Sequence, residues 1–341
     1  MKILQIVSSL SQSNGVMNVI MNYYRELYKY NIIFDFLYFE ESEINFKEEI
    51  LSLGGNTIYI GKNNKIKTIK AFKNFFKVDF NYDIIENHEL YLTNLIDKKK
   101  SKLILHSHTI KYSQKFLSMI RNRILCLGIE KKADYLASCS LKSGETFWKK
   151  YIRTEKFKKI PNAIPYEKCK YESIDRDEIR KKYKIEKDKH LLGYVARFDE
   201  GKNQQLLIQI IKKLNNDYQL MLVGNGKKFN NIQKYLKNNN LDKKVILTGQ
   251  INSFEVKKYL SAMDMFLFPS KNEGLGQAAI EAQGNGLFCI ISTGVPKEVK
   301  ISQNCVFLRA DNKNINAWVK QIECGNLIRK VIDFKKTRIW N

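Results

Sequence analysis

Short apolar runs alternate with longer amphipathic stretches along the chain, and in the first half the apolar runs predict buried parallel strands. These predicted strands cover residues 2–10, 32–39, 57–60, 82–88, 102–109 and 135–140, and the run 157–164 closes the first half. Apolar residues at helical spacing lie between them, and we predict helices at 16–30, near 45–53 and at 66–78.

The same alternation restarts in the second half, after a predicted helix at 177–185. Its predicted strands are 190–198, 218–226, 244–250, 265–270 and 288–293. Two successive β/α series predict an α/β protein with two doubly wound, Rossmann-like parallel-sheet domains that face a cleft. We assign residues 1–165 to the first domain, 166–327 to the second and 328–341 to a final helical segment.

Ligands of doubly wound sheets bind beyond the carboxyl ends of the strands, so the residues that follow each strand are the candidate site. Chain order predicts that both domains contribute to one cleft. The residues in these positions are Gly15, His88, His106, His108, Arg197, Gly224, Gly226, Gly249, Ser270 and Glu273.

The composition adds a strong positive charge, +24 over 341 residues. This charge favours a polyanionic partner such as nucleic acid, anionic lipid or a phosphorylated ligand, although a solvated lysine-rich surface explains it equally simply. The six cysteines lack the spacing of a zinc site, so we expect reduced thiols in a cytosolic protein. The N-terminal run resembles a first core strand more than a signal peptide, and no apolar run approaches the roughly 20 residues of a membrane span.

Two features of the second half suit a phosphorylated ligand. Arg197 ends one strand and Lys202 begins the next helix, and two cations at such a junction suit a diphosphate. The turn after a later strand contains Gly224 and Gly226, but Phe229 replaces the third glycine of a dinucleotide fingerprint. We therefore interpret this turn as a close approach of ligand to backbone, not as a NAD site.

The stretch Ser270–Gly286 contains two glutamates around a glycine-rich turn that opens a helix. The amide groups at the start of this helix, near Leu275–Gln277, favour an anion. Glu273 precedes the helix and Glu281 lies within it, and carboxylates bind pairs of sugar hydroxyls well. The alternative is structural, with Glu281 as a solubilising residue and Glu273 as a residue that stabilises the helix N-terminus.

Three of the four histidines lie at the ends of two predicted strands of the first domain, at positions 88, 106 and 108. A metal site is conceivable, but no carboxylate or cysteine spacing supports it, so we expect hydrogen bonding beside a reacting substrate. The acidic string Asp175–Glu178 resembles a metal-binding DxD motif. Because it opens a helix between the domains, we interpret it as a helix cap and expect no metal there.

Taken in order, these motifs resemble the GT-B-fold glycosyltransferases of family 4, the group 1 type that builds bacterial exopolysaccharide, capsule and O-antigen. The resemblance covers nearly the whole chain, and its most specific part is E-x7-E, here Glu273 to Glu281. The sequence departs from many relatives in a single-glycine loop at Gly15, in EGLG, and in a missing proline after Gly286-Leu287. The supporting motifs are the Gly15 loop, HSHT, IPNAI, Arg197 with Lys202, VGNG and LTGQ.

The resemblance implies roles for individual residues. Arg197 and Lys202 would bind the donor diphosphate and stabilise the leaving group, Glu281 would bind the ribose hydroxyls, and Glu273 would contact the donor sugar. The family also implies a final helix that crosses back to the first domain. The remaining donor-side candidates are Gly15, Gly224, Gly226, Thr248, Gly249, Gly274, Leu275, Gly276 and Gln277.

On the acceptor side, the resemblance implies that His108, or His106, lies by the anomeric centre, with His88 as a further candidate. It implies a retaining reaction with a nucleotide-sugar donor, most commonly a UDP-sugar, and neither cofactor nor catalytic metal. The acceptor would be a glycan on undecaprenyl diphosphate, which places the protein in the cytoplasm at the inner face of the plasma membrane.

Residues 98–129 contain eight Lys/Arg and no Asp/Glu, interleaved with apolar residues. This pattern predicts a helix on an anionic membrane surface, the alternative being an ordinary helix with a basic outer face. Two other functions stay open. A non-hydrolysing UDP-sugar epimerase shares the fold, and a nucleic-acid-binding protein fits the charge, although the chain has no recognition motif and we expect no nucleic-acid partner.

Overall fold

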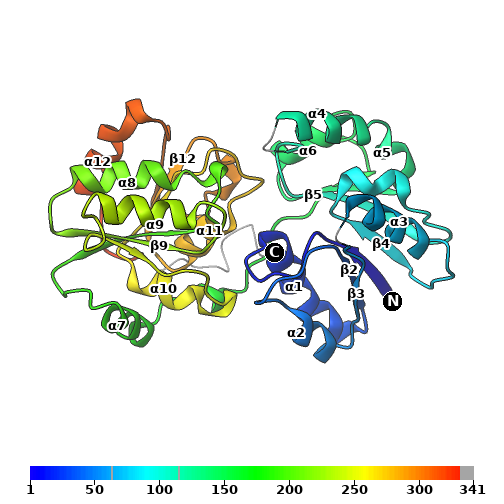
Figure 1. The fold of residues 1–341 in the computed structure, drawn as a ribbon, viewed down its shortest axis with the longest axis horizontal. Coiled ribbons are helices and arrows are strands. Elements are labelled where there is room, and N and C mark those ends of the chain that lie inside the picture. Colours follow the sequence, from blue (N-terminus) through cyan, green and yellow to red (C-terminus); the bar gives the residue numbers. More distant parts are fainter. Residues whose placement is uncertain (63, 114–115, 331–341) are drawn as a thin grey trace. The chain divides into compact units, whose positions relative to one another are not determined.

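The computed structural model describes residues 1–62, 64–113 and 116–330 (Figure 1). The chain divides into two compact units, Met1–Ala163 and Ile164–Asn341. Most of the expected final helix, residues 331–341, lies outside the described residues. Each unit contains one parallel sheet with helices between its strands, so the prediction of two Rossmann-like domains is confirmed.

Unit 1 contains a seven-stranded parallel sheet in the order β3-β2-β1-β4-β5-β6-β7. Its strands are β1 Lys2–Ile6, β2 Ile33–Tyr38, β3 Thr57–Tyr59, β4 Ile84–Asn87, β5 Lys102–Ser107, β6 Tyr135–Ser138 and β7 Phe157–Lys159. Its helices are α1 Gly15–Leu27, α2 Lys47–Ser52, α3 Lys65–Phe75, α4 Phe116–Leu125, α5 Ile129–Lys132 and α6 Leu141–Trp148.

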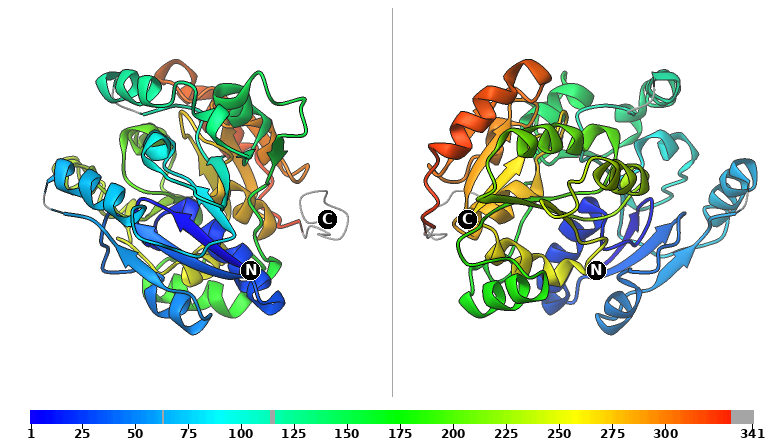
Figure 2. Two further views of the ribbon diagram at one scale, coloured as in Figure 1. Left: turned by 90° about the vertical axis from the view of Figure 1, so that its right-hand side faces the viewer. Right: turned by 60° about the vertical axis from the view of Figure 1, so that its left-hand side comes forward.

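Both faces of this sheet are covered, as the side-chain alternation of β1 shows. Ile3 belongs to one buried cluster, with the apolar residues of α1, and Leu4 belongs to the other, with those of α3. Figure 2 shows helices on either side of the strands. Sheets buried on both faces require nearly continuous apolar strands, which explains why the apolar runs predicted them.

Helix α1 also holds the last residues of unit 1. The Tyr23 hydroxyl donates a hydrogen bond to the Pro161 carbonyl oxygen at 2.5 Å, and the Asn22 amide donates to the Ala163 carbonyl oxygen at 2.8 Å. At the start of the same helix, Asn14 caps the first turn by accepting from the Val16 amide at 3.0 Å.

Unit 2 contains a six-stranded parallel sheet in the order β10-β9-β8-β11-β12-β13. Its strands are β8 His190–Val195, β9 Tyr218–Val223, β10 Val245–Leu247, β11 Met265–Phe268, β12 Phe288–Ser292 and β13 Cys305–Leu308. Its helices are α7 Ser173–Lys182, α8 Gln204–Lys213, α9 Phe229–Asn238, α10 Val256–Ala262, α11 Gln277–Gly284 and α12 Ile315–Glu323. Strand β13, at the edge of the sheet, was not predicted.

A carboxylate attaches α7 to the sheet of unit 2. Asp264 accepts hydrogen bonds from Arg176 at 2.7 Å, from Arg180 at 3.2 Å and from the Leu191 backbone amide at 2.7 Å. Helix α7 begins at Ser173, four residues before the predicted start, so Asp175 lies in its first turn. The N-cap is Glu172, which makes no side-chain cap hydrogen bond, so the predicted cap within Asp175–Glu178 is wrong. Asp175 is an acid of the first turn and lies 3.7 Å from Lys257.

Candidate functional site

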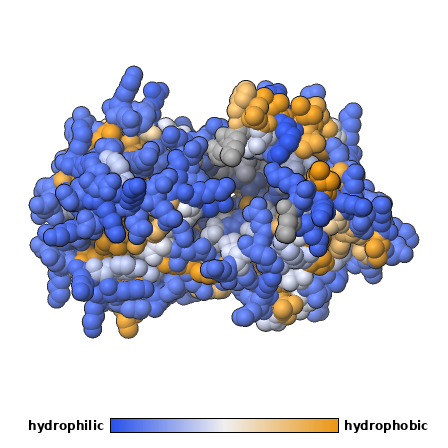
Figure 3. All heavy atoms as spheres, viewed as in Figure 1, coloured by the Kyte–Doolittle hydropathy of each residue, from blue (hydrophilic) through white to orange (hydrophobic). Residues whose placement is uncertain are grey.

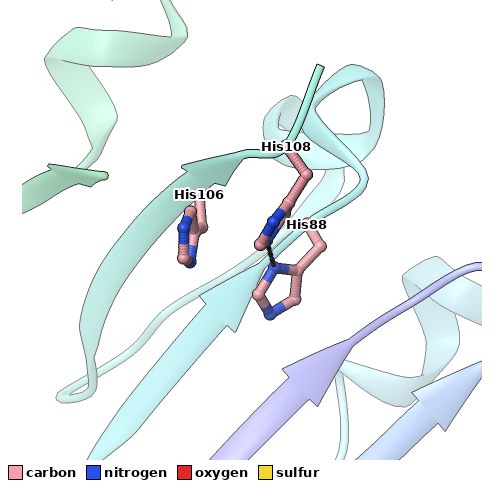
Figure 4. Close-up of side chains that lie close together, drawn as sticks. All are labelled: His88, His106 and His108. Carbon is pink, nitrogen blue, oxygen red and sulfur yellow. Dashed lines mark hydrogen bonds between the residues drawn. The ribbon is translucent and has the colours of Figure 1, made fainter. Parts of the chain in front are cut away.

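In unit 1, polar side chains replace apolar ones on one face of three adjacent strands. Gln5 lies in β1, Glu86 lies in β4 and His88 follows it, and His106 lies in β5. Gln5 pairs with Glu86 in the strand register. Because side chains alternate along a strand, Glu86 and His88 point to the same face, as do His106 and His108. The structure brings the three histidines together, with ring centroids 4.0–5.3 Å apart (Figure 4).

A chain of hydrogen bonds orients two of these histidines. The Gln5 amide nitrogen donates to Glu86 Oε2 at 2.9 Å, so the Gln5 oxygen is left to accept from His88 Nε2 at 2.7 Å. His88 Nδ1 then carries the lone pair and accepts from His108 Nε2 at 2.9 Å. In this tautomer set His108 Nδ1 is an acceptor.

The third histidine is held separately. His106 Nδ1 donates to Glu86 Oε1 at 2.8 Å, and the His106 side chain is buried. Among the described residues, His106 Nε2 is one of the few buried side-chain atoms with no hydrogen-bond partner. His88 and His108 are partly exposed whereas His106 is buried, so of the two histidines of the HSHT motif a ligand from solvent can reach His108.

Burial controls the charges in this cluster. Burial lowers the pKa of His88 to about 4, with the nearby Glu86 opposing the shift. Burial, together with the other two imidazoles, holds the pKa of His108 well below its usual value. Burial works against ionisation of Glu86, but the hydrogen bond from His106 and the nearby imidazoles lower its pKa to about 2. At neutral pH the cluster therefore combines a carboxylate with neutral imidazoles at positions 88 and 108.

In unit 2 the structure joins two predicted donor-side residues. Lys202 Nζ lies 2.5 Å from Glu273 Oε1, and the two side chains are 23% and 12% exposed. The Tyr194 hydroxyl donates to the Lys202 carbonyl oxygen at 2.8 Å and lies 3.1 Å from the Ser270 hydroxyl. These contacts fix the backbone on both sides of the pair, so the ammonium and carboxylate meet at the carboxyl ends of β8 and β11.

Arg197 extends from the end of β8 and is 63% exposed at its side chain. Its Nε donates to Asp199 at 3.1 Å, and Gln204 donates to its carbonyl oxygen at 3.0 Å. The side chains of Asp199 and Gln204 therefore hold Arg197, while the terminal nitrogens of its guanidinium remain available to an anion.

The glycine turn after β9 is close to the backbone of β8. Gly224 has φ +129° and donates to the Gly249 carbonyl oxygen at 3.0 Å. A Cβ atom at Gly224 would lie 2.1 Å from the Ala196 carbonyl oxygen. Gly226 has φ +153°, and a Cβ atom there would lie 2.6 Å from the Phe198 carbonyl oxygen. Both positions require glycine, and the turn stays open beside Arg197.

Thr248 and Gly249 follow β10, and the Thr248 hydroxyl donates to the Gly249 carbonyl oxygen at 2.8 Å. Gly274 and Leu275 are buried in the turn between Glu273 and α11. In unit 1, Gly15 is the first residue of α1, directly after its cap. The structure places each of these predicted residues after a strand or at a helix start.

The start of α11 differs from the prediction. The helix begins at Gln277, because Gly276 has φ +94° and acts as its N-cap, so Leu275 precedes the helix. Within the helix, Gln277 Nε2 donates to Glu281 Oε1 at 3.2 Å. Burial raises the pKa of Glu281 to about 7, and Lys168 opposes this shift. Glu281 is thus a partly buried, hydrogen-bonded carboxyl group of α11.

Gln5 and Glu86 were not predicted as site residues. Both occupy the interior of strands that are otherwise apolar, ILQI and IIEN, on the face that also bears the histidines. A buried polar residue in a parallel strand needs a partner, and this is the signal in the sequence that could have identified them.

Helix α4 presents apolar and basic side chains to solvent. Phe116, Leu117, Ile120 and Ile124 are 69%, 80%, 42% and 61% exposed. Figure 3 shows the resulting hydrophobic patch over α4. Within the described residues, no helix combines the length and apolar character needed to cross a membrane.

Residues 175–324, which carry Arg197, Lys202 and both glutamates, match the family described as Glycosyl transferases group 1. This second part of the chain is similar to the group 1 glycosyltransferases, the family that the sequence motifs resemble. The family match and the curated relatives below support the predicted family and a transferase enzyme.

Curated relatives and solved structures agree with this assignment. The chain is 27% identical to EpsF of Bacillus subtilis (strain 168), named as a glycosyltransferase, over 94% of this chain and 86% of EpsF. It is also 27% identical to an Escherichia coli enzyme named UDP-Gal:alpha-D-GlcNAc-diphosphoundecaprenol alpha-1,3-galactosyltransferase, over 57% of this chain and 48% of that enzyme. Its fold is similar to that of Anabaena HepE in complex with UDP-glucose, with a TM-score of 0.74, 17% identity and coverage of 95% and 90%.

Proposed function

We propose that this protein is a group 1 glycosyltransferase that moves a sugar from a UDP-sugar to a glycan acceptor carried on undecaprenyl diphosphate, with retention of anomeric configuration, in bacterial surface polysaccharide synthesis. The observation that carries the proposal is the Lys202–Glu273 pair at 2.5 Å, within the region that matches the family. UDP and diphosphoundecaprenol both appear in the name of the galactosyltransferase relative.

Glycosyl transfer breaks the bond between the anomeric carbon and the donor diphosphate, and forms one to an acceptor oxygen. Positive charge develops on the sugar and negative charge on the departing diphosphate. In the proposal, Lys202 and Arg197 stabilise the diphosphate, and no metal is needed there. Glu273 lies beside the sugar, where its carboxylate accepts from hydroxyls and offsets the positive charge, and Glu281 accepts from the ribose hydroxyls.

On the acceptor side we assign the reacting position to His108. Its imidazole is more exposed than that of His106, and its Nε2 is held by His88. In the tautomer set described above, His108 Nδ1 can accept a hydrogen bond from an acceptor hydroxyl. Gln5 and Glu86 act as positioning residues, because they fix the tautomers of this network.

We also propose that α4 binds the cytoplasmic face of the plasma membrane, where a lipid-linked acceptor would be found. The apolar patch of α4 is flanked by Arg121 and Arg123, and a helix with apolar and basic exposed residues suits an anionic lipid surface. The chain's net charge of +24 acts in the same direction.

The test begins with a thermal-shift screen of nucleotide sugars, followed by transfer to a synthetic undecaprenyl-diphosphate glycan. Arg197→Ala and Glu281→Ala should weaken UDP binding and lower transfer, with circular dichroism confirming the fold. Transfer at the wild-type rate in both variants would refute the site. Epimerised UDP-sugar formed without acceptor would favour the epimerase, and tight, salt-sensitive DNA binding without UDP binding would favour the nucleic-acid alternative.

A further inference from the structure

The three histidines of unit 1 are arranged like the ligands of a metal ion. One ring nitrogen from each of His88, His106 and His108 can be chosen so that all three atoms lie within 4.8 Å of one another. Figure 4 shows His106 and His108 on the β5 side and His88 on the β4 side, with their rings adjacent. We propose that these histidines bind one divalent transition-metal ion of the zinc class.

The second observation is the unpaired nitrogen of His106. This side chain is 3% exposed, and its Nε2 has no hydrogen-bond partner among the described residues. A buried nitrogen that carries a lone pair and lacks a donor costs free energy unless a ligand satisfies it. Since Glu86 fixes the hydrogen on Nδ1, Nε2 is the atom left to bind the ion.

The outer contacts also match those of metal-bound histidines. Such histidines usually donate their other ring N–H to a carboxylate or carbonyl oxygen, which fixes the tautomer and ring orientation. Here His106 donates to the Glu86 carboxylate and His88 donates to the Gln5 amide oxygen. Imidazole is a ligand type that suits zinc, copper and nickel, and a three-histidine set leaves one coordination position open.

Metal binding and the present hydrogen bond exclude each other. His88 Nδ1 and His108 Nε2 share one hydrogen at 2.9 Å. Two nitrogens on a tetrahedral zinc ion, each at about 2.0–2.1 Å, lie about 3.3 Å apart. The two rings must separate by a few tenths of an ångström, and His108 must move its hydrogen to Nδ1. The nitrogen that His108 offers to an acceptor hydroxyl in the proposed function is then blocked.

The inference therefore has two parts. The first, metal binding, does not depend on the enzyme's activity. The second rests on the proposed function: bound metal inhibits transfer reversibly, because it withdraws His108 from the acceptor. This departs from the expectation that the protein binds no metal, although the donor diphosphate still needs none.

The binding test uses the full chain without a polyhistidine tag, treated with chelator and dialysed. Calorimetric titration with Zn²⁺ should show one ion per chain, and Co²⁺ should give the visible absorption of a tetrahedral site without a thiolate charge-transfer band. His88→Ala and His108→Ala should each lose this site. His190→Ala is the matched control, since the fourth histidine lies in β8 of unit 2, and it should bind as the wild type does.

Glu86→Gln retains the ligands and removes the outer carboxylate, so its metal affinity should fall roughly 10–100-fold. Thermal melting establishes whether each variant folds. The His88 and His108 variants test the site without changing the buried His106. The absence of a saturable site in the wild type, retention of the site in His88→Ala, or a thiolate band would overturn the first part.

The inhibition test adds Zn²⁺ and then excess chelator to the wild type and to His190→Ala during transfer. Both should lose activity and recover it. If Zn²⁺ binds with one-ion stoichiometry while transfer continues unchanged, the second part is wrong. If no transfer is found with any donor, the proposed function fails, whereas the calorimetric result still decides the metal site.

Discussion

The Lys202–Glu273 pair leads to a prediction with two opposite effects. Glu273→Gln keeps the shape of the side chain and removes its charge, so Lys202 loses the anion that it holds at 2.5 Å. A nucleoside diphosphate no longer competes with that carboxylate for the ammonium group. We therefore expect Glu273→Gln to bind UDP more tightly while it transfers sugar more slowly, because the donor sugar loses its carboxylate partner.

The size of the effect follows from the geometry. Two unit charges 2.5 Å apart attract by about 7 kcal/mol at an effective dielectric constant of about 20. Desolvation of two partly buried groups offsets most of this attraction, and contacting residues typically couple by about 0.5–3 kcal/mol. If about 1–2 kcal/mol is released to the ligand, UDP affinity rises about 5–30-fold. The loss of transition-state stabilisation by a similar amount lowers kcat by about tenfold.

Calorimetric titration with UDP at constant ionic strength measures the first effect, and initial rates at saturating donor measure the second. Glu200→Gln is the matched control, because Glu200 lies in the same segment as Lys202 but pairs with another lysine. Its side chain is 82% exposed and lies 3.7 Å from Lys228. In Lys202→Met, the added Glu273→Gln change should give no gain in UDP affinity. Equal or weaker UDP binding by Glu273→Gln alone would refute the reasoning.

Three further predictions concern pH, membrane binding and stability. Burial raises the pKa of Glu281 to about 7, so the native state binds the proton of this carboxyl group more tightly than the unfolded chain does. As the pH rises from 4.5 to 7, the unfolding free energy of the wild type should therefore fall by up to about 3 kcal/mol relative to that of Glu281→Gln. Urea titrations across this range decide it, and a constant difference would contradict the shift. Leu117→Asp on α4 should reduce co-sedimentation with anionic vesicles. The control is Ile66→Asp on α3, where the side chain is 76% exposed, and it should not change co-sedimentation. Equal binding of the wild type to anionic and neutral vesicles would exclude the membrane site. Asp264→Ala leaves two arginines without their carboxylate and should cost about 3–5 kcal/mol in urea unfolding, and a loss below about 1 kcal/mol would show that the arginines find other partners.

The strands of this protein could be predicted because both faces of each sheet are buried. Apolar runs such as KILQI and YQLMLV leave little choice of structure. Strand β13, Cys305–Leu308, is different, since it has only four residues at a sheet edge and three of them are partly exposed. Length alone does not explain the miss, since β3 and β10 have three residues each and were predicted; the pairing of β13 with β12 is decided by the rest of the sheet.

The candidate site could be predicted in part, for a related reason. Residues that follow a strand are visible in the sequence, and Lys202, Glu273 and the histidines were found in this way. The partners that orient them depend on which strands are neighbours, and the register that places Gln5 opposite Glu86 crosses 81 residues of sequence. The first residue of α11 was likewise set by the left-handed conformation of Gly276, which lets the chain turn before the helix begins.

Helix α1 has a mechanical consequence. Its first residue is Gly15, a donor-side candidate. Further along the helix, Asn22 and Tyr23 donate hydrogen bonds to the carbonyl oxygens of Ala163 and Pro161, respectively. A helix is stiff, and Asn22 lies about 10 Å along it from Gly15. Helix α1 therefore links Gly15 mechanically to the last residues of unit 1, so a displacement at one end of the helix would be felt at the other.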